Sequence, residues 1–281
     1  MTRPDSRTWL VTGASRGLGL AFAQVALEAG DSVVATARKP EQLDELVRAH
    51  PGRALALGLD VTDKAAVDAV VPRAAEFTGR LDVLVNNAGY GLAGGVEEAT
   101  EREVRDQFEV NVFGALWCTQ AVLPVMRAQG AGHLFQISSI GGVAGFLNTG
   151  IYHASKWALE GFSESLAQEV APFGIGVTIV EPGPFRTDWN GDSMTRATPL
   201  PAYDEILGAR REAMSGSLAR TQAGDPRRAG EALLAVLDSD TPPLRLLLGA
   251  LAADVGPATY RRRLTEWADW DAVARGADFP Q

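Results

Sequence analysis

Short apolar segments rich in β-branched residues alternate with longer segments of helical periodicity over most of this chain. The first two apolar segments, residues 8–12 and 32–36, flank a segment at 18–29 whose apolar positions repeat every 3.6 residues. Strands that are apolar along their whole length are typical of parallel sheets with helices on both faces. The alternation therefore predicts an α/β fold with a Rossmann-type, doubly wound parallel sheet. Further strands are expected at residues 54–59, 81–86, 133–138, 176–181 and, at an edge, 244–248, with helices near 63–78, 100–128 and 152–171.

The whole chain, residues 1–281, is expected to form a single domain, because no linker rich in Pro, Gly or Ser and no internal repeat divides it. Residues 183–224 break the alternation with several prolines and glycines and are interpreted as a substrate-binding lobe. Residues 250–281 predict a helical C-terminal extension. Its simplest interpretation is an amphipathic helix that buries its aromatic residues and leaves three consecutive arginines in solvent. These aromatic residues are Tyr260, Trp267 and Trp270.

A glycine-rich turn connects the first expected strand to the first helix, with the sequence Thr-Gly-Ala-Ser-Arg-Gly-Leu-Gly at residues 12–19. Glycines allow a tight turn and a close approach of the backbone to a pyrophosphate, and the helix N-terminus offers free N–H groups. The spacing Gly-x-x-x-Gly-x-Gly departs from the common Gly-x-Gly-x-x-Gly pattern, and a glycine triplet alone also fits an ordinary turn. Its place at the first crossover favours dinucleotide binding. The residues expected to contact the cofactor here are Gly13, Ser15, Arg16, Gly17, Leu18 and Gly19.

The end of the second expected strand predicts which dinucleotide is preferred. Dinucleotide folds commonly place an acidic side chain on the adenosine ribose about 20 residues beyond the glycines. Here that window holds Arg38 and Lys39 and no carboxylate, and Arg16 in the glycine turn adds a third cation. The alternative is that these charges are only the solvated end of a strand. The missing acid and the extra arginine predict NADP(H), with the cations pairing with its 2′-phosphate.

A tyrosine and a lysine open the helix expected after the fifth strand. Hydride transfer to a carbonyl leaves a developing alkoxide that a positioned acid must protonate. Tyr152 is a candidate, and Lys156, four residues on, lies on the same helix face. A free phenol titrates near pH ~10, and lowering its pKa by roughly two to three units takes about 3–4 kcal/mol. The ammonium group of Lys156 is expected to favour the phenolate and so to lower the pKa of Tyr152.

Two further polar positions complete a candidate catalytic set. The hydroxyl of Ser138 or Ser139, at the end of the fifth strand, is expected to donate a hydrogen bond to the carbonyl oxygen as negative charge develops. Asn111 lies within a predicted helix. Taken singly, each candidate also has an ordinary structural interpretation. The tyrosine fits an amphipathic helix, the lysine a solvated surface, the serine a helix or turn cap, and the asparagine a local backbone ligand.

Together with the glycine turn, these motifs resemble the short-chain dehydrogenase/reductase family over residues 8–188. Residues 33–38 and the long C-terminal tail are most similar to the branch that includes 17β-hydroxysteroid dehydrogenase-like enzymes. In the family the catalytic serine stands thirteen residues before the tyrosine, and this selects Ser139. The resemblance implies that Lys156 also hydrogen-bonds the nicotinamide ribose, and that Asn111 holds a water that relays protons to the lysine. The implied catalytic residues are Ser139, Tyr152, Lys156 and Asn111.

The resemblance also implies cofactor contacts outside the glycine turn. Asp60, followed by Val61, matches an aspartate that meets the adenine amino group, although a cap of the helix at 63–78 is a comparable interpretation. The loop after the fourth strand stabilises the central sheet and lines the adenosine ribose in the family. A threonine beyond the sixth strand binds the nicotinamide carboxamide there. The matching residues are Asn87, Ala88 and Gly89 in the loop, and Pro182, Gly183 and Thr187 beyond the strand.

Composition excludes several other classes of protein. The 281 residues carry 26 basic and 35 acidic side chains, a net charge of −9, which disfavours nucleic acid as a partner. The single cysteine, Cys118, cannot form an intrachain disulfide, and the three histidines lack metal-ligand spacing, so no metal site is expected. No signal peptide and no uncharged apolar run of ~18 residues is found, so we expect a cytoplasmic protein without a membrane partner. Apolar residues around much of the helix at 154–171 suggest a homodimer or homotetramer.

The sequence thus predicts an NADP(H)-dependent oxidoreductase of the carbonyl reductase type, which interconverts a ketone or aldehyde with an alcohol. The NADP preference suggests reduction. One alternative is a dehydratase or epimerase on the same scaffold, and another is a sensor that binds NADP(H) without chemistry. The expected pocket walls are mostly apolar and favour a hydrophobic substrate. These wall residues are Tyr90, Ile140, Phe146, Leu147, Trp189 and Met194.

Overall fold

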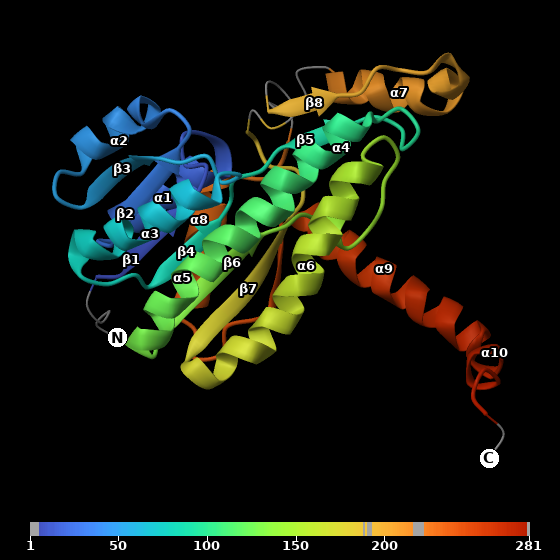
Figure 1. Cartoon of the computed structure of the whole chain (residues 1–281). Coiled ribbons are helices and arrows are strands. Elements are labelled where there is room, and N and C mark those ends of the chain that lie inside the picture. Colours follow the sequence, from blue (N-terminus) through green and yellow to red (C-terminus); the bar gives the residue numbers. More distant parts are fainter. Residues whose placement is uncertain (1–5, 188, 190–192, 216–221, 280–281) are drawn as a thin grey trace.

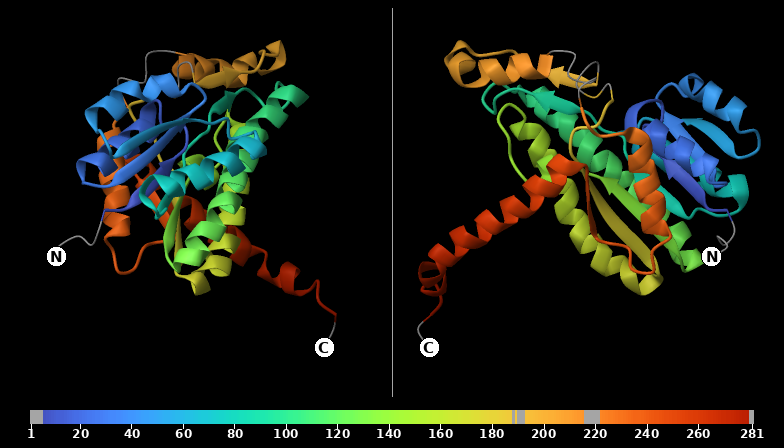
Figure 2. Two further views of the ribbon diagram at one scale, coloured as in Figure 1. Left: turned by 60° about the vertical axis from the view of Figure 1, so that its left-hand side comes forward. Right: turned by 180° about the vertical axis from the view of Figure 1, so that it is seen from behind.

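Seven parallel strands form one central sheet in the computed structural model, with helices on both of its faces (Figures 1 and 2). The structure describes residues 6–187, 189, 193–215 and 222–279. The strand order is β3-β2-β1-β4-β6-β7-β9. Strands are therefore added outward on one side of β1 as far as β3 and then on its other side from β4 onward, and the order reverses between β1 and β4. The strands are β1 (Thr8–Val11), β2 (Ser32–Ala37), β3 (Ala54–Gly58), β4 (Val83–Asn86), β6 (Gly132–Ile137), β7 (Ile175–Pro182) and β9 (Arg245–Leu248).

Side chains that alternate along each strand feed two separate cores. On β1, Trp9 packs with Phe22 of α1 in one core, whereas Leu10 packs with Val122 of α5 in the other. The first core lies beneath α1, α2 and α8, and the second beneath α3, α5 and α6. The helices are α1 (Gly17–Glu28), α2 (Asp44–Ala49), α3 (Lys64–Thr78), α4 (Glu101–Phe108), α5 (Ala115–Gln129), α6 (Gly150–Val170), α7 (Asp204–Ser215), α8 (Pro226–Leu237), α9 (Ala250–Asp269) and α10 (Asp271–Arg275).

The predicted doubly wound parallel sheet is confirmed, including the edge strand β9, which pairs with β7. The helix expected at 100–128 is divided, because a π-helical turn, Glu109–Gly114, separates α4 from α5. A small parallel sheet of β5 (Gly91–Ala93) and β8 (Met194–Arg196) was not predicted. Each of its strands has only three residues, too few for a sequence period to appear.

The helical segment that spans α4, the π turn and α5 is long and apolar enough, by length and composition alone, to cross a membrane. A window of 18 residues within Glu101–Gln129 has a mean hydropathy of 1.2. In the fold, its apolar side chains include Cys118, Val122 and Met126, which are buried in the second core. A core helix of this kind passes the same test of length and composition, so the finding is weak evidence for a membrane span.

The lobe between β7 and α8 rests on two acidic residues that precede α4. Glu98 accepts a hydrogen bond from the backbone N–H of Leu200 at 2.8 Å and forms an ion pair with Arg211 of α7. Tyr203 donates its hydroxyl to Glu97 at 2.5 Å. Because the Glu98 side chain is buried, its ion pair holds α7 over the carboxyl end of the sheet.

The C-terminal extension differs from its expected packing. Helix α9 begins against β9 and then projects from the body with α10 (Figure 1). Arg263 is partly buried, with its guanidinium 4.8 Å from the ring centre of Trp157 and a hydrogen bond of 2.7 Å to the Val143 carbonyl. Trp267 and Trp270, by contrast, are 64% and 66% exposed. The expectation that this helix buries its aromatic residues is therefore wrong, because the helix leaves the body beyond Arg263. Arg261 and Arg262 are exposed as expected, and only Arg263 is not.

Candidate active site

All the polar motifs singled out in the sequence meet at the carboxyl edge of the sheet. The glycine turn follows β1, residues 86–89 end and follow β4, Ser139 follows β6, and Gly183 follows β7. In a doubly wound sheet, ligands bind at this edge, beside the point where the strand order reverses. Here the reversal lies between β1 and β4, so the glycine turn and the loop after β4 flank it.

The glycine turn has a conformation that only glycine adopts easily. Gly13 and Gly17 have φ angles of 63° and 59°, in the left-handed region. A Cβ atom at Gly19 would lie 2.5 Å from the Gly13 carbonyl oxygen and would also collide with the Asn87 amide. The N-cap residue of α1, which begins in this turn, is Arg16, and its side chain makes no capping hydrogen bond. The first N–H groups of α1 are therefore open to an anion, which fits a dinucleotide pyrophosphate.

Asn87 and Thr12 hold the glycine turn in place. The Asn87 amide donates to the carbonyl oxygens of Thr12 and Gly13 at 2.8 and 3.1 Å. The Thr12 hydroxyl accepts hydrogen bonds from the backbone N–H groups of Asn87 and Ala88, both at 3.0 Å. These four bonds join the end of β4 to the turn after β1, so Asn87 here acts as a brace between the two loops.

Three cations lie near the expected position of the adenosine phosphate. Arg16, Arg38 and Lys39 are exposed, and their side chains make no hydrogen bond or ion pair with the described part of the chain. Most arginines elsewhere in the fold are paired, as Arg245 is with three glutamates. Cations that the protein leaves unpaired beside a phosphate cradle fit a 2′-phosphate as their partner.

Asp60 does not cap helix α3. The cap is Asp63, whose carboxylate accepts the N–H of Ala66 at 3.1 Å. Asp60 is exposed, and its Oδ1 accepts hydrogen bonds from the backbone and hydroxyl of Thr62 at 3.0 and 2.8 Å. The helix-cap interpretation of Asp60 is therefore wrong, and its carboxylate lies in the open loop after β3. Val61, next in the chain, is buried against the π turn at Gly114.

Tyr152 and Lys156 lie on one buried face of α6, and each is 6% exposed. The Lys156 ammonium lies 5.9 Å from the centre of the Tyr152 ring and donates a hydrogen bond of 2.7 Å to the Ile137 carbonyl at the end of β6. Ser139 follows two residues later, and its hydroxyl caps the short 3₁₀ turn Ile140–Gly142 by accepting the N–H of Gly141 at 3.0 Å. The end of β6 and the start of α6 thus bring a hydroxyl, a phenol and an ammonium together.

The protein by itself raises the pKa of Tyr152 rather than lowering it. Burial disfavours the phenolate and raises the pKa of Tyr152 to about 12, and a hydrogen bond with Ser139 opposes this shift. Burial also lowers the pKa of Lys156 to about 8, while the charge of Glu160 opposes that change. For the chain alone, the net pKa of Tyr152 is therefore raised, and not lowered as expected. Desolvation outweighs the attraction of an ammonium that is directed at the Ile137 carbonyl, so Tyr152 holds its proton.

Asn111 lies inside the π turn, with its side chain fully hydrogen-bonded. Its amide donates to the Tyr90 carbonyl at 3.0 Å and to the Ser155 hydroxyl at 3.1 Å, and its Oδ1 accepts the N–H of Tyr90. A Cβ atom at Gly89 would lie 3.0 Å from the Asn111 Oδ1 and 3.7 Å from the Lys156 Nζ. The π turn therefore places the Asn111 side chain near the same point as the Lys156 ammonium. The interpretation of Asn111 as a backbone ligand holds as well, because it bonds both backbone groups of Tyr90.

Thr187 lies against the glycine turn, although 170 residues separate them in the sequence. A Cβ atom at Gly17 would lie 3.6 Å from the Thr187 Cβ. Pro182 ends β7, and the N–H of Gly183 bonds to the Leu248 carbonyl of β9 at 2.9 Å, which turns the chain back over the sheet edge. The structure therefore brings Pro182, Gly183 and Thr187 to the same edge as the glycine turn.

Trp189 covers Tyr152 on the side of the lobe. Their ring centres are 5.2 Å apart, with the planes inclined by 58°. The indole packs on Gly91 and joins a cluster with Met194 and two residues that sequence reasoning missed, Ala93 and Met214. No period or motif marks Ala93 or Met214, since only β5, β8 and α7 bring them together. Of the other expected wall residues, Phe146 packs edge-on against His153, whereas Leu147 is 60% exposed.

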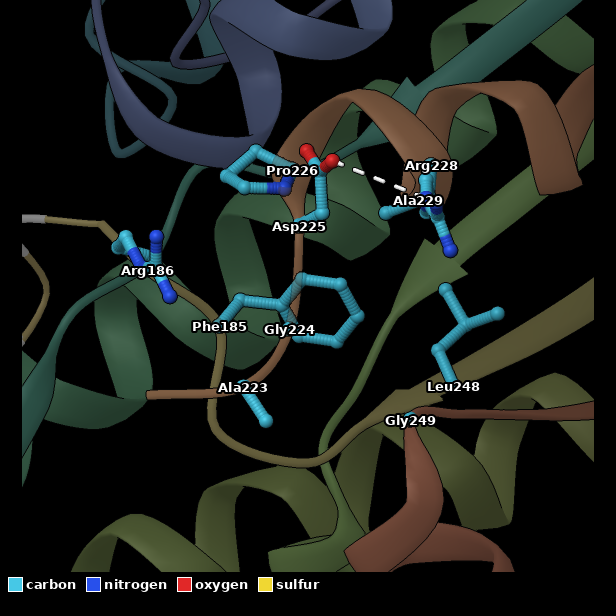
Figure 3. Close-up of a pocket in the computed structure, with 10 residues that line it drawn as sticks. All are labelled: Phe185, Arg186, Ala223, Gly224, Asp225, Pro226, Arg228, Ala229, Leu248 and Gly249. Carbon is cyan, nitrogen blue, oxygen red and sulfur yellow. Dashed lines mark ion pairs between the residues drawn. The ribbon is translucent and has the colours of Figure 1, made fainter. Parts of the chain in front are cut away.

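A cavity of about 640 Å³ lies beside this site, and no predicted catalytic residue lines it (Figure 3). It opens between the segment after β7, the N-terminus of α8 and the end of β9. Its charged lining residues are Arg186, Arg228 and Asp225, and the last of these caps α8. The candidate active site is therefore placed at Ser139, Tyr152 and Lys156, and not in this cavity. Among the described residues, no group of three or more His, Cys, Asp or Glu side chains is placed to hold a metal ion.

Comparison with known proteins gives consistent similarities. A family model described as short chain dehydrogenase matches residues 7–197. The oxidoreductase BOA17 of Botryotinia fuckeliana is 45% identical over 89% of this chain and 91% of its own length. A 3-ketodihydrosphingosine reductase of Bacteroides thetaiotaomicron is 38% identical over 86% of this chain and 87% of its own.

Solved structures extend the similarity to the full fold. A short-chain dehydrogenase from Streptomyces avermitilis has a TM-score of 0.91 and 46% identity, covering 99% of this chain and 100% of its own. One from Burkholderia cenocepacia in complex with NADP has a TM-score of 0.74 and 27% identity, covering 94% and 97%. One from Burkholderia phymatum in complex with NAD shares the fold, with a TM-score of 0.76 and 24% identity, covering 100% and 99%.

Proposed function

Because the chain belongs to the short-chain dehydrogenase/reductase family, we propose that it is an NADP(H)-dependent reductase of hydrophobic ketones or aldehydes. One observation carries this proposal. A buried, protonated phenol at Tyr152 lies beside the hydroxyl of Ser139 and the ammonium of Lys156, at the sheet edge that also holds a phosphate cradle. An acid next to a hydrogen-bond donor is what reduction of a carbonyl needs.

The residues of this chain divide the reaction among themselves. A bound nicotinamide dinucleotide supplies the hydride for the carbonyl carbon. The Ser139 hydroxyl donates a hydrogen bond to the carbonyl oxygen, which stabilises the negative charge that develops there. Tyr152 gives its phenolic proton to that oxygen and completes the alcohol. Lys156 stabilises the phenolate left on Tyr152, and Asn111 lies beside the lysine on the route by which a proton returns.

The proposed preference for NADP(H) rests on the three unpaired cations. Arg16 lies in the glycine turn, while Arg38 and Lys39 follow β2, which pairs directly with β1. No carboxylate occupies the end of β2 to repel a phosphate. The complex of the Burkholderia cenocepacia relative with NADP supports the same preference, whereas the Burkholderia phymatum relative is a complex with NAD.

The proposed substrate class follows from the apolar surface over Tyr152. Trp189, Met194 and Met214 lie on this side, where a carbonyl must approach. Methionine side chains adapt their shape to apolar ligands, and a wall of methionine and tryptophan offers a ligand few hydrogen-bonding groups. The name of the Bacteroides relative, a reductase of the long-chain ketone 3-ketodihydrosphingosine, supports a ketone with a long apolar part.

The test is the loss of NADPH absorbance with a panel of ketones and aldehydes that differ in the length of their apolar part. We expect turnover with NADPH, faster for longer apolar substrates, and much slower turnover with NADH. Binding of NADPH without oxidation by any carbonyl would favour the alternative of a non-catalytic sensor. Conversion of a substrate without net oxidation of NADPH would favour a dehydratase or epimerase.

We expect the rate of reduction to fall as pH rises through about 8. Burial lowers the pKa of Lys156 to about 8, so above that pH the lysine becomes a neutral amine and no longer stabilises the developing phenolate. Tyr152 keeps its proton over the same range, because its pKa is raised to about 12. The measurement is kcat for carbonyl reduction between pH 6 and 10. A matched Lys156→Arg variant keeps its charge and should lack this decline, and a flat wild-type profile to pH 10 would contradict the assignment.

We further propose a cytoplasmic homodimer or homotetramer. Trp157 on α6, Phe113 in the π turn and Phe173 after α6 expose large apolar surfaces. A second copy that covers them would remove apolar area from water. Sedimentation velocity at micromolar concentration tests this, and a monomer at all concentrations would contradict it.

A further inference from the structure

A buried hydrogen bond lies directly behind the proposed catalytic residues and involves neither Ser139 nor Tyr152. The Ser138 hydroxyl donates to the Glu160 carboxylate at 2.5 Å, and both residues are 4% exposed. We propose that Glu160 and Ser138 are positioning residues, which fix Ser139 relative to Tyr152 by tying the end of β6 to α6. This inference rests on the proposed reductase function for its catalytic consequence, but the tie itself is testable without activity.

The tie consists of two parallel hydrogen bonds between β6 and α6. Lys156 donates to the Ile137 carbonyl at 2.7 Å, and one helical turn later Glu160 accepts from Ser138. Tyr152, Lys156 and Glu160 follow one another at intervals of four residues and so share one face of α6. Consecutive residues of the strand are thus bound to consecutive turns of the helix. Ser139 is the next residue of the chain, so its position is set by the register between the end of β6 and α6.

The short turn that begins at Ser139 packs directly on the same bond. A Cβ atom at Gly142 would lie 2.5 Å from the Ser138 hydroxyl oxygen and would also collide with the Glu160 carboxylate. The Ser139 hydroxyl caps this turn, and the Gly141 carbonyl accepts the indole N–H of Trp157 at 2.9 Å. The turn is therefore held between α6 and the Ser138–Glu160 pair. Loss of the pair would leave a space beneath the turn into which Ser139 can shift.

Arg245 on β9 forms an ion pair with the buried Glu160 carboxylate. Its guanidinium donates to the second oxygen of Glu160 at 2.6 Å, to Glu164 at 2.8 Å, and to Glu181 of β7. A buried carboxylate without a partner would take up a proton instead of accepting a strong hydrogen bond. With three carboxylates around one cation, burial and the charge of Glu160 raise the pKa of Glu181 to about 7. Glu160 itself accepts hydrogen bonds from both Ser138 and Arg245, one on each carboxylate oxygen.

The catalytic test is the Ser138→Ala variant, which removes the Ser138–Glu160 bond of the tie and leaves the Lys156–Ile137 bond and the ion pair of Glu160 with Arg245 intact. We expect kcat to fall by roughly tenfold to a hundredfold, because small misplacements of reacting groups are costly. The KM for NADPH should change little, since Ser138 lies outside the phosphate cradle. A general loss of folding would lower the melting temperature and weaken NADPH binding together.

Two variants serve as matched controls. Ser163→Ala removes an equally buried hydroxyl from α6. This hydroxyl donates to the Leu159 carbonyl of the same helix at 2.6 Å and does not reach β6. Glu164→Gln removes a half-exposed carboxylate from the same arginine without touching Ser138. Both are expected to retain wild-type kcat. A loss of kcat in Ser163→Ala as large as in Ser138→Ala would overturn the proposal, because any buried hydroxyl would then suffice.

Hydrogen–deuterium exchange tests the tie independently of the reaction. Amides of residues 137–142 should exchange faster in Ser138→Ala than in the wild type or in Ser163→Ala. Unchanged exchange with unchanged kcat would overturn the proposal. If none of the carbonyls tested supported oxidation of NADPH by the wild type, the proposed function would fail. The exchange result would still decide whether Ser138 and Glu160 hold the turn.

Discussion

Replacement of Tyr152 by phenylalanine is expected to lower kcat by about a thousandfold and to leave NADPH binding almost unchanged. A positioned general acid contributes about 10²–10⁴ in rate, and this variant removes the phenolic proton while keeping the ring. The ring still packs 5.2 Å from Trp189, so the shape of the pocket persists. The measurements are kcat for carbonyl reduction and the Kd of NADPH from its fluorescence.

Tyr90→Phe is the matched control for this experiment. Tyr90 is a second tyrosine of the same site, whose backbone groups, rather than its hydroxyl, bond to Asn111 and Gln107. Its phenol also has a pKa raised to about 12, chiefly by burial. We expect this variant to keep most of its turnover. A Tyr152→Phe enzyme with more than a tenth of the wild-type kcat would remove Tyr152 from the role of acid.

The second large effect is expected from Arg38→Asp, which should raise the KM for NADPH by roughly 30- to 100-fold and leave that for NADH within a few-fold. A hydrogen bond to a charged group is worth about 1.5–3 kcal/mol, and each 1.4 kcal/mol is tenfold in affinity. The new carboxylate adds repulsion of the 2′-phosphate, which NADH lacks. The measurement is the ratio of kcat/KM for the two cofactors.

Arg73→Asp makes the same change of charge elsewhere and serves as the control. Arg73 is exposed on α3, in the C-terminal half of that helix. The N-terminus of α3, which follows β3, is the end that lies at the carboxyl edge of the sheet. Its cofactor ratio should equal that of the wild type. An unchanged ratio in Arg38→Asp would show that Arg38 is only a solvated strand end. An equal change in both variants would point to the overall charge of the protein.

Much of the fold was predictable from sequence because it depends on short-range patterns. Apolar runs and helical periods located the seven strands of the sheet, even the edge strand at 245–248. The glycines at 13, 17 and 19 predicted a tight turn, and the structure has left-handed φ angles of 63° and 59° at the first two. The division at the π turn and the pairing of β5 with β8 were missed. One extra residue per turn and three-residue strands are too small to leave a period.

The properties of the candidate site were less predictable, because they depend on burial. Spacing alone suggested that Lys156 lowers the pKa of Tyr152, yet the lysine is directed at the Ile137 carbonyl and desolvation prevails. For Asp60 the sequence left open an adenine contact or a helix cap, and the structure gives the cap to Asp63. Trp267 and Trp270 looked like core residues, but α9 carries them away from the body.

The sequence by itself determined the parallel α/β sheet, the family, and the order of the candidate residues along the chain, because each of these is written in local periods and short motifs. Only the tertiary structure decided that Tyr152 holds its proton, that Trp189 covers it, and that Ser138 and Glu160 tie β6 to α6. These features depend on desolvation and on contacts between residues that are distant in sequence, such as Glu160 with Arg245, 85 residues apart. No local pattern records such distances, so they follow only from the way in which the helices pack on the sheet.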